Sequence, residues 1–185
     1  MKKFPLLAAA LTLSAAVGCG GSSPASNLNG TPAEIMDKLN ETVSVAGPVT
    51  FDSPLTAENA PVIGLTPEEF DKYVTDAVLS TAAISTFAYE TALISAKDSA
   101  AAAQVKKLIA AGYDSKKWIC VFPEKSCVAE SGNYVLLAAG RGENVDALFD
   151  AFTELAGVTG DRDVFFAGLS DGATGGGTGG MILPR

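Results

Sequence analysis

The stretch Ser126–Gly140 limits the possible folds of this chain more than any other. Within it, Ser131-Gly132-Asn133 separates two apolar runs, and Gly and Asn tolerate the positive φ that tight hairpin turns require. The second run, Tyr134–Ala139, is almost uninterrupted, which is typical of a strand that is covered on both faces. The sequence therefore predicts a β-hairpin whose second strand is buried.

Four helices are predicted from their caps and their apolar stripes. Thr31-Pro32-Ala33-Glu34 and Thr66-Pro67-Glu68-Glu69 each combine a threonine cap, a proline at the first helical position and a glutamate that can reach back to the cap. A third helix is expected over Ser99–Ala111, with Asp98 as its cap and Gly112 as its stop, and a fourth over Asn144–Ala156, closed by Gly157. The expected buried faces are Ile35, Leu39 and Val43; Phe70, Val74 and Ala77; Ala101, Val105, Leu108 and Ile109; and Val145, Leu148, Phe149, Phe152 and Leu155.

Two further strands complete the predicted fold. Ile84–Ala96 favours a strand, Asp163–Leu169 is a candidate for a short one, and the prolines between Ala46 and Pro61 indicate a connecting loop with a turn at Thr56–Asn59. The predicted class is α+β: a small, mostly antiparallel or mixed sheet with a β-α-β-β core, covered by helices and preceded by two N-terminal helices.

The first nineteen residues predict export and a lipid anchor. Lys2 and Lys3 precede the apolar run Phe4–Val17, which is short for a membrane-spanning helix. Ala16-Val17-Gly18-Cys19 resembles the lipobox of bacterial lipoproteins, in which the cysteine is acylated. The alternative is an ordinary cleaved signal peptide followed by a chance cysteine. We expect lipidation at Cys19, because polar and glycine-rich residues follow it directly.

The composition shifts divide the chain into four parts. We expect a signal peptide over 1–18, a flexible tether over 19–30, one α+β domain over 31–160 and a glycine-rich tail over 161–185. The glycine run at Gly172–Gly180 lacks the Lys-Ser/Thr of a phosphate-binding loop, so a linker is the preferred interpretation. No cofactor is indicated.

Composition also excludes several function classes. The chain has no histidine, which removes Ser-His-Asp and Cys-His catalysis and the common histidine-ligated zinc sites. Its formal net charge is -8, so a phosphate backbone would be repelled and nucleic acid is not an expected partner.

Short motifs along the chain resemble a family of small lipoproteins of Gram-positive bacteria, filed as domain of unknown function 4358. The resemblance covers roughly 31–156 and implies an extracytoplasmic, lipid-anchored α+β domain without implying any reaction. The motifs are Leu55-Thr56-Ala57-Glu58-Asn59-Ala60, Gly64-Leu65-Thr66-Pro67-Glu68-Glu69-Phe70, Ala96-Lys97-Asp98, Trp118, Pro123-Glu124 and Gly132-Asn133-Tyr134-Val135-Leu136-Leu137.

Four groups of side chains are candidates for chemistry or binding. Glu90 lies in an otherwise uncharged strand, where an outward position is the simpler interpretation and a tuned carboxylate is the alternative. Asp161-Arg162-Asp163 with Asp171 would suit a calcium ion only poorly, so a solvated turn is preferred. Trp118, Phe122 and Tyr134 would make either an aromatic platform for a ligand or, as we expect, part of the core. Cys120 and Cys127 are a possible disulfide outside the cytoplasm, with two free thiols as the alternative.

The sequence supports two hypotheses about function. The first is a non-catalytic binding or interaction module, anchored by lipid at the outer face of the cytoplasmic membrane, with a protein or cell-envelope ligand. The second is a carboxylate-based hydrolase of the cell envelope, which would need two acidic groups about 5–10 Å apart across a cleft. Glu90, Glu124 and Glu130 are the structured candidates for that pair.

Overall fold

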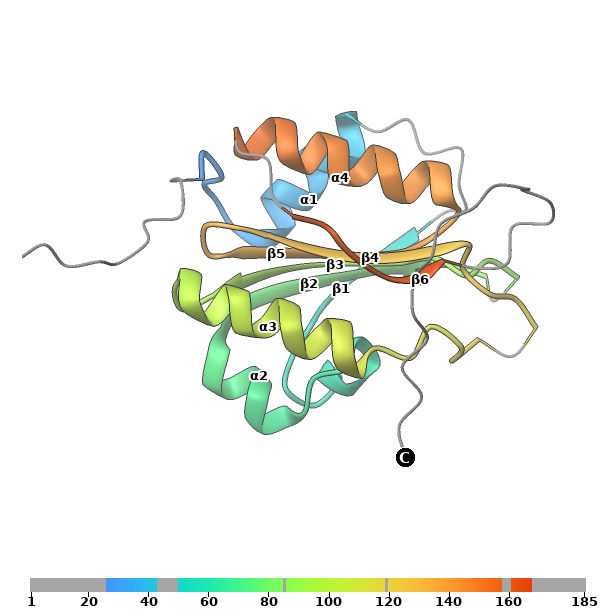
Figure 1. The fold of residues 1–185 in the computed structure, drawn as a ribbon, viewed down its shortest axis with the longest axis horizontal. Helices are drawn as coiled ribbons and strands as arrows, with labels where there is room; N and C mark the ends of the chain where they lie inside the picture. The colour runs from blue at the N-terminus through green and yellow to red at the C-terminus, as the bar shows by residue number, and fades with distance from the viewer. Residues whose placement is uncertain (1–25, 43–49, 85, 119, 158–160, 168–185) are drawn as a thin grey trace, which may run out of the picture.

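A computed structural model describes residues 26–42, 50–84, 86–118, 120–157 and 161–167, and in it one sheet lies between two layers of helices (Figure 1). The elements are α1 (Pro32–Thr42), β1 (Thr50–Pro54), the 3-10 helix η1 (Ala60–Ile63), α2 (Pro67–Tyr73), β2 (Val74–Ala82), β3 (Glu90–Ala96), α3 (Ser99–Gly112), β4 (Lys125–Ser131), β5 (Tyr134–Gly140), α4 (Gly142–Ala156) and β6 (Asp163–Ala167). The strand order is β1-β2-β3-β5-β4-β6, and every neighbouring pair is antiparallel. The predicted α+β class is confirmed.

The predicted hairpin is formed by β4 and β5. Ser131 pairs with Tyr134, so the loop between the strands has two residues, Gly132 and Asn133. Gly132 has φ +59°, and no non-glycine residue among those described has a positive φ. A positive φ at the first central residue alone is the arrangement of a type II′ turn, which suits the twist of a hairpin.

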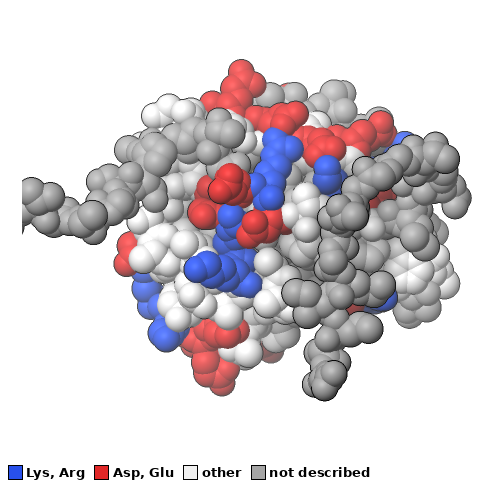
Figure 2. Space-filling model, in the orientation of Figure 1, with Lys and Arg blue, Asp and Glu red and all other residues white. Residues whose placement is uncertain are grey.

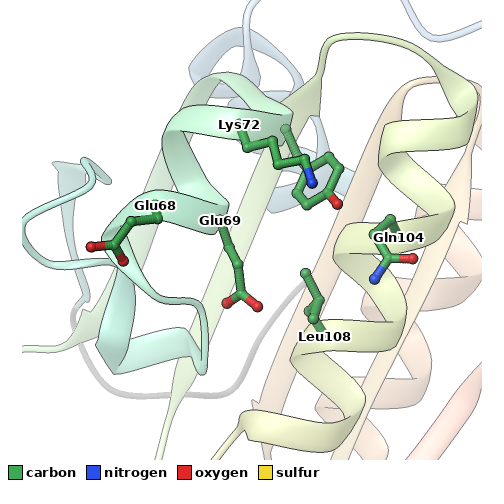
Figure 3. A pocket seen from close by; sticks show the side chains of 6 residues that line it. Glu68, Glu69, Lys72, Gln104 and Leu108 are labelled. Carbon is green, nitrogen blue, oxygen red and sulfur yellow. The ribbon is translucent and has the colours of Figure 1, made fainter.

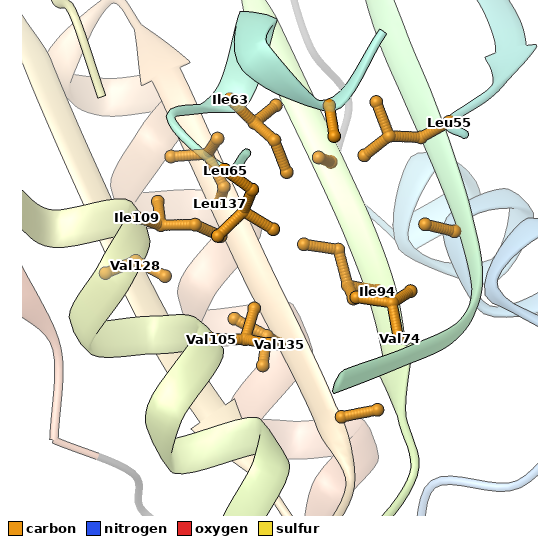
Figure 4. Packing of buried hydrophobic residues seen from close by; sticks show 14 of the residues in the cluster. Leu55, Ile63, Leu65, Val74, Ile94, Val105, Ile109, Val128, Val135 and Leu137 are labelled. Atoms are coloured by element: carbon orange, nitrogen blue, oxygen red, sulfur yellow. The ribbon is translucent and has the colours of Figure 1, made fainter. Parts of the chain in front are cut away.

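Strand β5 lies near the middle of the sheet and is buried along its whole length, as predicted. Its alternate side chains enter two separate clusters. Val135 and Leu137 pack with η1, α2 and α3 on one face (Figure 4), while Leu136 and Ala138 pack with α1 and α4 on the other. A strand between two apolar layers needs apolar side chains on both faces, which explains its unbroken hydrophobic run.

The N-terminal caps of α2 and α3 form as the sequence predicts, but the predicted stop at Gly112 is wrong, because Gly112 is the last residue of α3 and Tyr113 caps that end. Thr66 accepts a hydrogen bond from the Glu69 amide while the Glu69 carboxylate accepts one from the Thr66 amide, which completes a capping box. Asp98 accepts from the Ala101 amide at 2.7 Å and begins α3. At the C-terminal end of α4, Gly157 adopts the left-handed conformation with φ +68° and stops the helix.

The second predicted helix is too long. Its prediction extended the apolar stripe through Val74 and Ala77, but α2 ends at Tyr73 and Val74 begins β2. Strand β2 pairs with β1 on one side and with β3 on the other, and this pairing outweighs the local helical spacing. Strand β1 was also missed, because the prolines between Ala46 and Pro61 indicated a connecting loop. Proline is tolerated there because β1 is a short strand at the edge of the sheet.

The strand predicted over Ile84–Ala96 is shorter than expected and begins at Glu90. The turn predicted at Thr56–Asn59 is confirmed, since the Asn59 amide donates to the Thr56 carbonyl at 3.2 Å. Phe149 and Phe152, predicted as core, are 0% and 2% exposed.

Residues 26–30, which the sequence assigns to the flexible tether, pack against the domain. The Asn27 amide donates to the Ala156 carbonyl at 2.8 Å, and the Tyr134 hydroxyl donates to the Gly30 carbonyl at 2.7 Å. The Ser26 and Ser131 hydroxyls lie 2.9 Å apart. We call residues 26–30 the strap. It binds beside the β4–β5 turn, at what we call the hairpin end of the sheet (Figure 1).

Candidate functional site

Exposed apolar side chains gather at the end of the sheet opposite the hairpin, which we call the far end. The strand register places Thr81, Glu90, Ala139 and Ser126 side by side at this end. Phe51 pairs with Thr81 at the same level of the sheet, and the β2–β3 connection and the segment before β4 also lie here. The exposed large apolar residues at the far end are Phe51, Ile84, Phe87 and Phe122, of which Phe51 is 64% exposed.

A buried ion pair lies at the same end, on the face that α3 covers. The Lys117 ammonium is 2.6 Å from the Glu90 carboxylate and donates a second hydrogen bond to the Val62 carbonyl at 2.7 Å. The side chain of Glu90 is 3% exposed and that of Lys117 is 22% exposed. Strand β3, η1 and the segment after α3 therefore meet on one ammonium group.

Two aromatic rings complete the surroundings of this ammonium. The Lys117 nitrogen lies 4.4 Å from the centre of the Tyr113 ring and 5.1 Å from that of Trp118, distances at which a cation is attracted to the π face. Glu90, Tyr113, Trp118 and the Val62 carbonyl together form what we call the ammonium cage.

The cage is electrostatically costly. Burial raises the pKa of Glu90 even though Lys117 acts in the opposite direction. Burial likewise lowers the pKa of Lys117 against the opposing effect of Glu90. Both shifts have the sign of a pair whose desolvation outweighs its mutual attraction.

The Tyr113 hydroxyl is a further polar group of the cage. Tyr113 is 8% exposed, and its buried hydroxyl interacts with the neighbouring Glu90 carboxylate without reaching the geometry of a well-formed hydrogen bond. Burial first, and the neighbouring Glu90 carboxylate second, raise the pKa of this hydroxyl well above its usual range. Phe165 of β6 packs against the Tyr113 ring edge-to-face, with ring centres 5.5 Å apart, and thereby holds it in place.

The outward position expected for Glu90 is wrong. Glu90 shares the sheet face of Ala92 and Ile94, which lies under η1 and α3. Its partner Lys117 is 27 residues away in a segment with no regular structure, so no local pattern links the two residues. The only sequence signal was the charge itself in an otherwise uncharged strand.

The other two carboxylates of the hydrolase hypothesis have separate structural roles. Glu124 accepts a hydrogen bond from the Gly142 amide at 2.9 Å, at the start of α4. Glu130 pairs with Lys106 of α3 at 2.7 Å. Glu130 aligns with Val135 and Glu90 with Ala139, so four residues of β5, about 13 Å, separate the two positions along the sheet. Glu90 and Glu130 are thus too far apart for a catalytic pair, and the Glu124 carboxylate is bound to the start of α4, which covers the sheet face opposite to that of Glu90.

The three aromatic residues considered as a platform are also separated. Tyr134 is buried on the α1/α4 face, whereas Trp118 packs on the α3 face. Both contribute to the core, as expected, but Phe122 is 58% exposed and does not.

Two of the residues considered for calcium, Arg162 and Asp163, form ion pairs instead, and the Asp161 carbonyl accepts a hydrogen bond from Lys106 at 3.0 Å. Basic and acidic side chains alternate on the surface of the molecule (Figure 2). Arg162 pairs with Asp150 and Asp146, and Asp163 pairs with Lys106 at 3.5 Å. Asp171 lies outside the described residues. Within the described ranges, no group of three or more Cys, Asp or Glu is arranged to hold a metal ion.

Both described cysteines are free thiols in the structure, so the possible disulfide between Cys120 and Cys127 is not formed in it. Cys127 points into the α1/α4 cluster and is fully buried, while Cys120 is exposed. Burial raises the pKa of the Cys127 thiol. Cys19, the predicted lipidation site, and the glycine run 172–180 lie outside the described residues.

An open groove of about 290 Å³ lies between α2 and α3 (Figure 3). Its lining residues are Glu68, Glu69, Lys72, Tyr73, Gln104 and Leu108. Glu69 is occupied by the capping box, and Lys72 lies 4.9 Å from the centre of the Tyr73 ring. Two of its polar side chains, Glu69 and Lys72, thus serve the local structure of α2.

Comparisons with known proteins leave the site to be judged on its geometry. No protein-family model matches the chain, and neither the search of curated proteins nor that of solved structures finds a similar protein. The resemblance to the lipoprotein family stays a prediction. Across the parts of the chain that the structure describes, no helix is both long enough and apolar enough to cross a membrane.

Proposed function

We propose that this protein is a lipid-anchored interaction module at the outer face of the cytoplasmic membrane, and that its far end contacts a protein or cell-envelope ligand. The observation that carries the proposal is the position of the exposed apolar side chains relative to the chain entry. The strap enters at the hairpin end, whereas Phe51, Ile84, Phe87 and Phe122 lie at the far end.

The strap gives the domain an orientation if Cys19 carries the lipid. Ser26 lies seven positions after Cys19, a span of at most about 25 Å even when fully extended. The seven-residue strands β4 and β5 are themselves about 23 Å long. Because the strap fixes the entry point beside the β4–β5 turn, the hairpin end is the end nearest to the anchor, and the far end is the end free to face away from the bilayer.

Aromatic side chains, phenylalanine included, are enriched at protein interfaces relative to the rest of the surface. Single exposed apolar residues are ordinary on a protein surface, but here four of them share one end of the sheet with the ammonium cage. This grouping supports contact with a partner at the far end.

The anchor is tested by phase partitioning of the mature protein from its native membrane. The wild-type protein is expected in the detergent phase, and Cys19→Ala is expected in the aqueous phase or as unprocessed precursor. Detergent-phase partitioning that survives Cys19→Ala would refute the lipid anchor.

The contact surface is tested by introducing a photo-crosslinking amino acid at single positions of the anchored protein. Phe87 and Phe122 report on the far end, and Asp76, which is exposed and pairs with Ser95 beside Tyr134, is the exposed control position at the hairpin end. We expect a discrete crosslinked product from the two far-end positions and none from Asp76. Crosslinking of equal yield from all three positions would contradict a far-end contact surface.

A further inference from the structure

The ammonium cage has the composition of a binding site for an external amine. It combines a buried carboxylate, a backbone carbonyl and two aromatic faces around a single positive nitrogen. We infer that Lys117 is an internal, displaceable occupant of this cage, and that the cage accepts the primary ammonium group of a ligand in its place. The inference rests on the proposed function, because it names the chemical class of ligand that the binding module takes.

Exchange of one ammonium group for another avoids the main energetic cost of removing Lys117, which is a buried Glu90 carboxylate left without a counter-charge. A buried, ionised carboxylate without a partner is strongly unfavourable, so Glu90 needs a cation as long as it is ionised. An incoming ammonium supplies that cation as Lys117 leaves. Lys117 is partly exposed, so its side chain can return to water by rotation about its own bonds.

An external ammonium also has a hydrogen-bonding option that Lys117 leaves unused. An ammonium group has three N–H donors, and the Lys117 ammonium donates to two acceptors within the described residues, the Glu90 carboxylate and the Val62 carbonyl. The buried Tyr113 hydroxyl lies close to the Glu90 carboxylate, and its oxygen can accept a hydrogen bond while its proton faces that carboxylate. A ligand whose nitrogen is not tied to the Lys117 backbone can shift to donate its third hydrogen bond to this hydroxyl.

The contacts of the cage select a primary ammonium on a narrow alkyl chain. The distances of 2.6 and 2.7 Å to Glu90 and Val62 are hydrogen bonds that require N–H donors, which a quaternary ammonium lacks. The occupant that the cage already accommodates is a lysine side chain, and n-butylammonium reproduces that side chain from its Cβ outward. Lysine side chains of a partner and free alkylamines share this chemistry.

The test uses the full chain in detergent micelles, labelled with ¹³C at the lysine ε-carbon and titrated with n-butylammonium. The Lys117 signal starts from a position shifted by the rings of Tyr113 and Trp118, and we expect it to move toward that of a free lysine. The neighbouring, exposed Lys116 is an internal control whose signal should not move. The uncharged 1-butanol should leave both signals in place.

A second arm removes the internal occupant. In Lys117→Ala the missing part of the side chain corresponds to n-propylammonium, which should raise the melting temperature of the variant and bind at least about tenfold more tightly than to the wild type. Glu90→Gln combined with Lys117→Ala should abolish this rescue. Lys116→Ala, at the neighbouring exposed lysine, is the matched control variant and should behave as the wild type.

The outcomes separate this inference from the proposed function. A Lys117 signal that stays fixed in the wild type, while Lys117→Ala responds to the amine, would show a permanent structural lysine and overturn the exchange. A folded Lys117→Ala that ignores the amine would overturn the cage as a site. Neither result depends on lipidation at Cys19 or on crosslinking at the far end, which test the proposed function separately.

Discussion

Replacing Lys117 with methionine should lower the free energy of unfolding of this domain far more than replacing both Glu90 and Lys117 does. Glu90 is 3% exposed, and the Lys117 ammonium at 2.6 Å is its neutralising partner. Removing one partner of a buried pair typically costs about 3–5 kcal/mol, a large part of a small domain's stability. In Glu90→Gln with Lys117→Met no buried charge remains, so the free energy of unfolding should be within about 1 kcal/mol of the wild type or higher.

The measurement is urea denaturation followed by circular dichroism for the wild type, the two single variants and the double variant. These four proteins form a double-mutant cycle, from which we expect a coupling energy of at least about 2 kcal/mol, because Glu90 and Lys117 are in direct contact. Lys116→Met, at the adjacent exposed position, should change stability by no more than about 0.5 kcal/mol. Additive single effects would refute the claim that Glu90 is a buried charge dependent on Lys117.

The same variants give a pH test with a definite sign. Burial already raises the pKa of Glu90 above its ordinary value of 4.5, and Lys117→Met removes the group that opposes this effect. A carboxyl with a raised pKa in the folded state contributes stability at low pH and loses it as the pH rises through that pKa. The gap in stability between Lys117→Met and the wild type should therefore narrow as the pH is lowered toward 4.5. A gap that is constant with pH would contradict this assignment.

Three further predictions concern the frame around the site. Phe149→Ala should cost about 3–5 kcal/mol in urea denaturation, since the ring is fully buried, and an unchanged midpoint would contradict its place in the core. Peptide mapping after thiol labelling should find Cys120 labelled in the native protein and Cys127 only after unfolding; protection of both in unreduced, denatured protein would indicate a disulfide. Gly64→Ala should cost more than about 2 kcal/mol, because φ is +85° and the new Cβ would lie 2.5 Å from backbone atoms at the end of α3. Gly142→Ala, whose nearest contact would be 3.7 Å away, is its control and should melt normally.

Local signals in the sequence were sufficient for the helices and for the hairpin. The Thr66 cap, the Asp98 cap and the turn at Gly132-Asn133 each act within four residues, so the sequence shows them directly. Strand β2 is different, because its conformation depends on pairing with β1 and β3 on both sides. A helical spacing at Phe70, Val74 and Ala77 was therefore misleading where strand pairing decides the structure.

The ammonium cage could not be predicted from the sequence either, because it also depends on contacts between distant parts of the chain. Its members come from η1, β3, the end of α3 and the irregular segment that follows, and they are joined only by the tertiary fold. Charge at Glu90 marked an unusual position, but the choice between an outward and a buried carboxylate depends on which sheet face η1 and α3 cover.

If the chain is exported and acylated at Cys19, as we propose, the strap has a consequence for the order of these events. Its hydrogen-bond partners lie far along the chain: Ser26 meets Ser131, 105 residues later, and Gly30 meets Tyr134, 104 residues later. A chain that crosses the membrane with its N-terminus first presents the strap before these partners have emerged. An enzyme that acylates Cys19 would thus meet a segment with nothing yet to bind, and the docking contacts would close last, fixing the direction of the domain only after the anchor is in place.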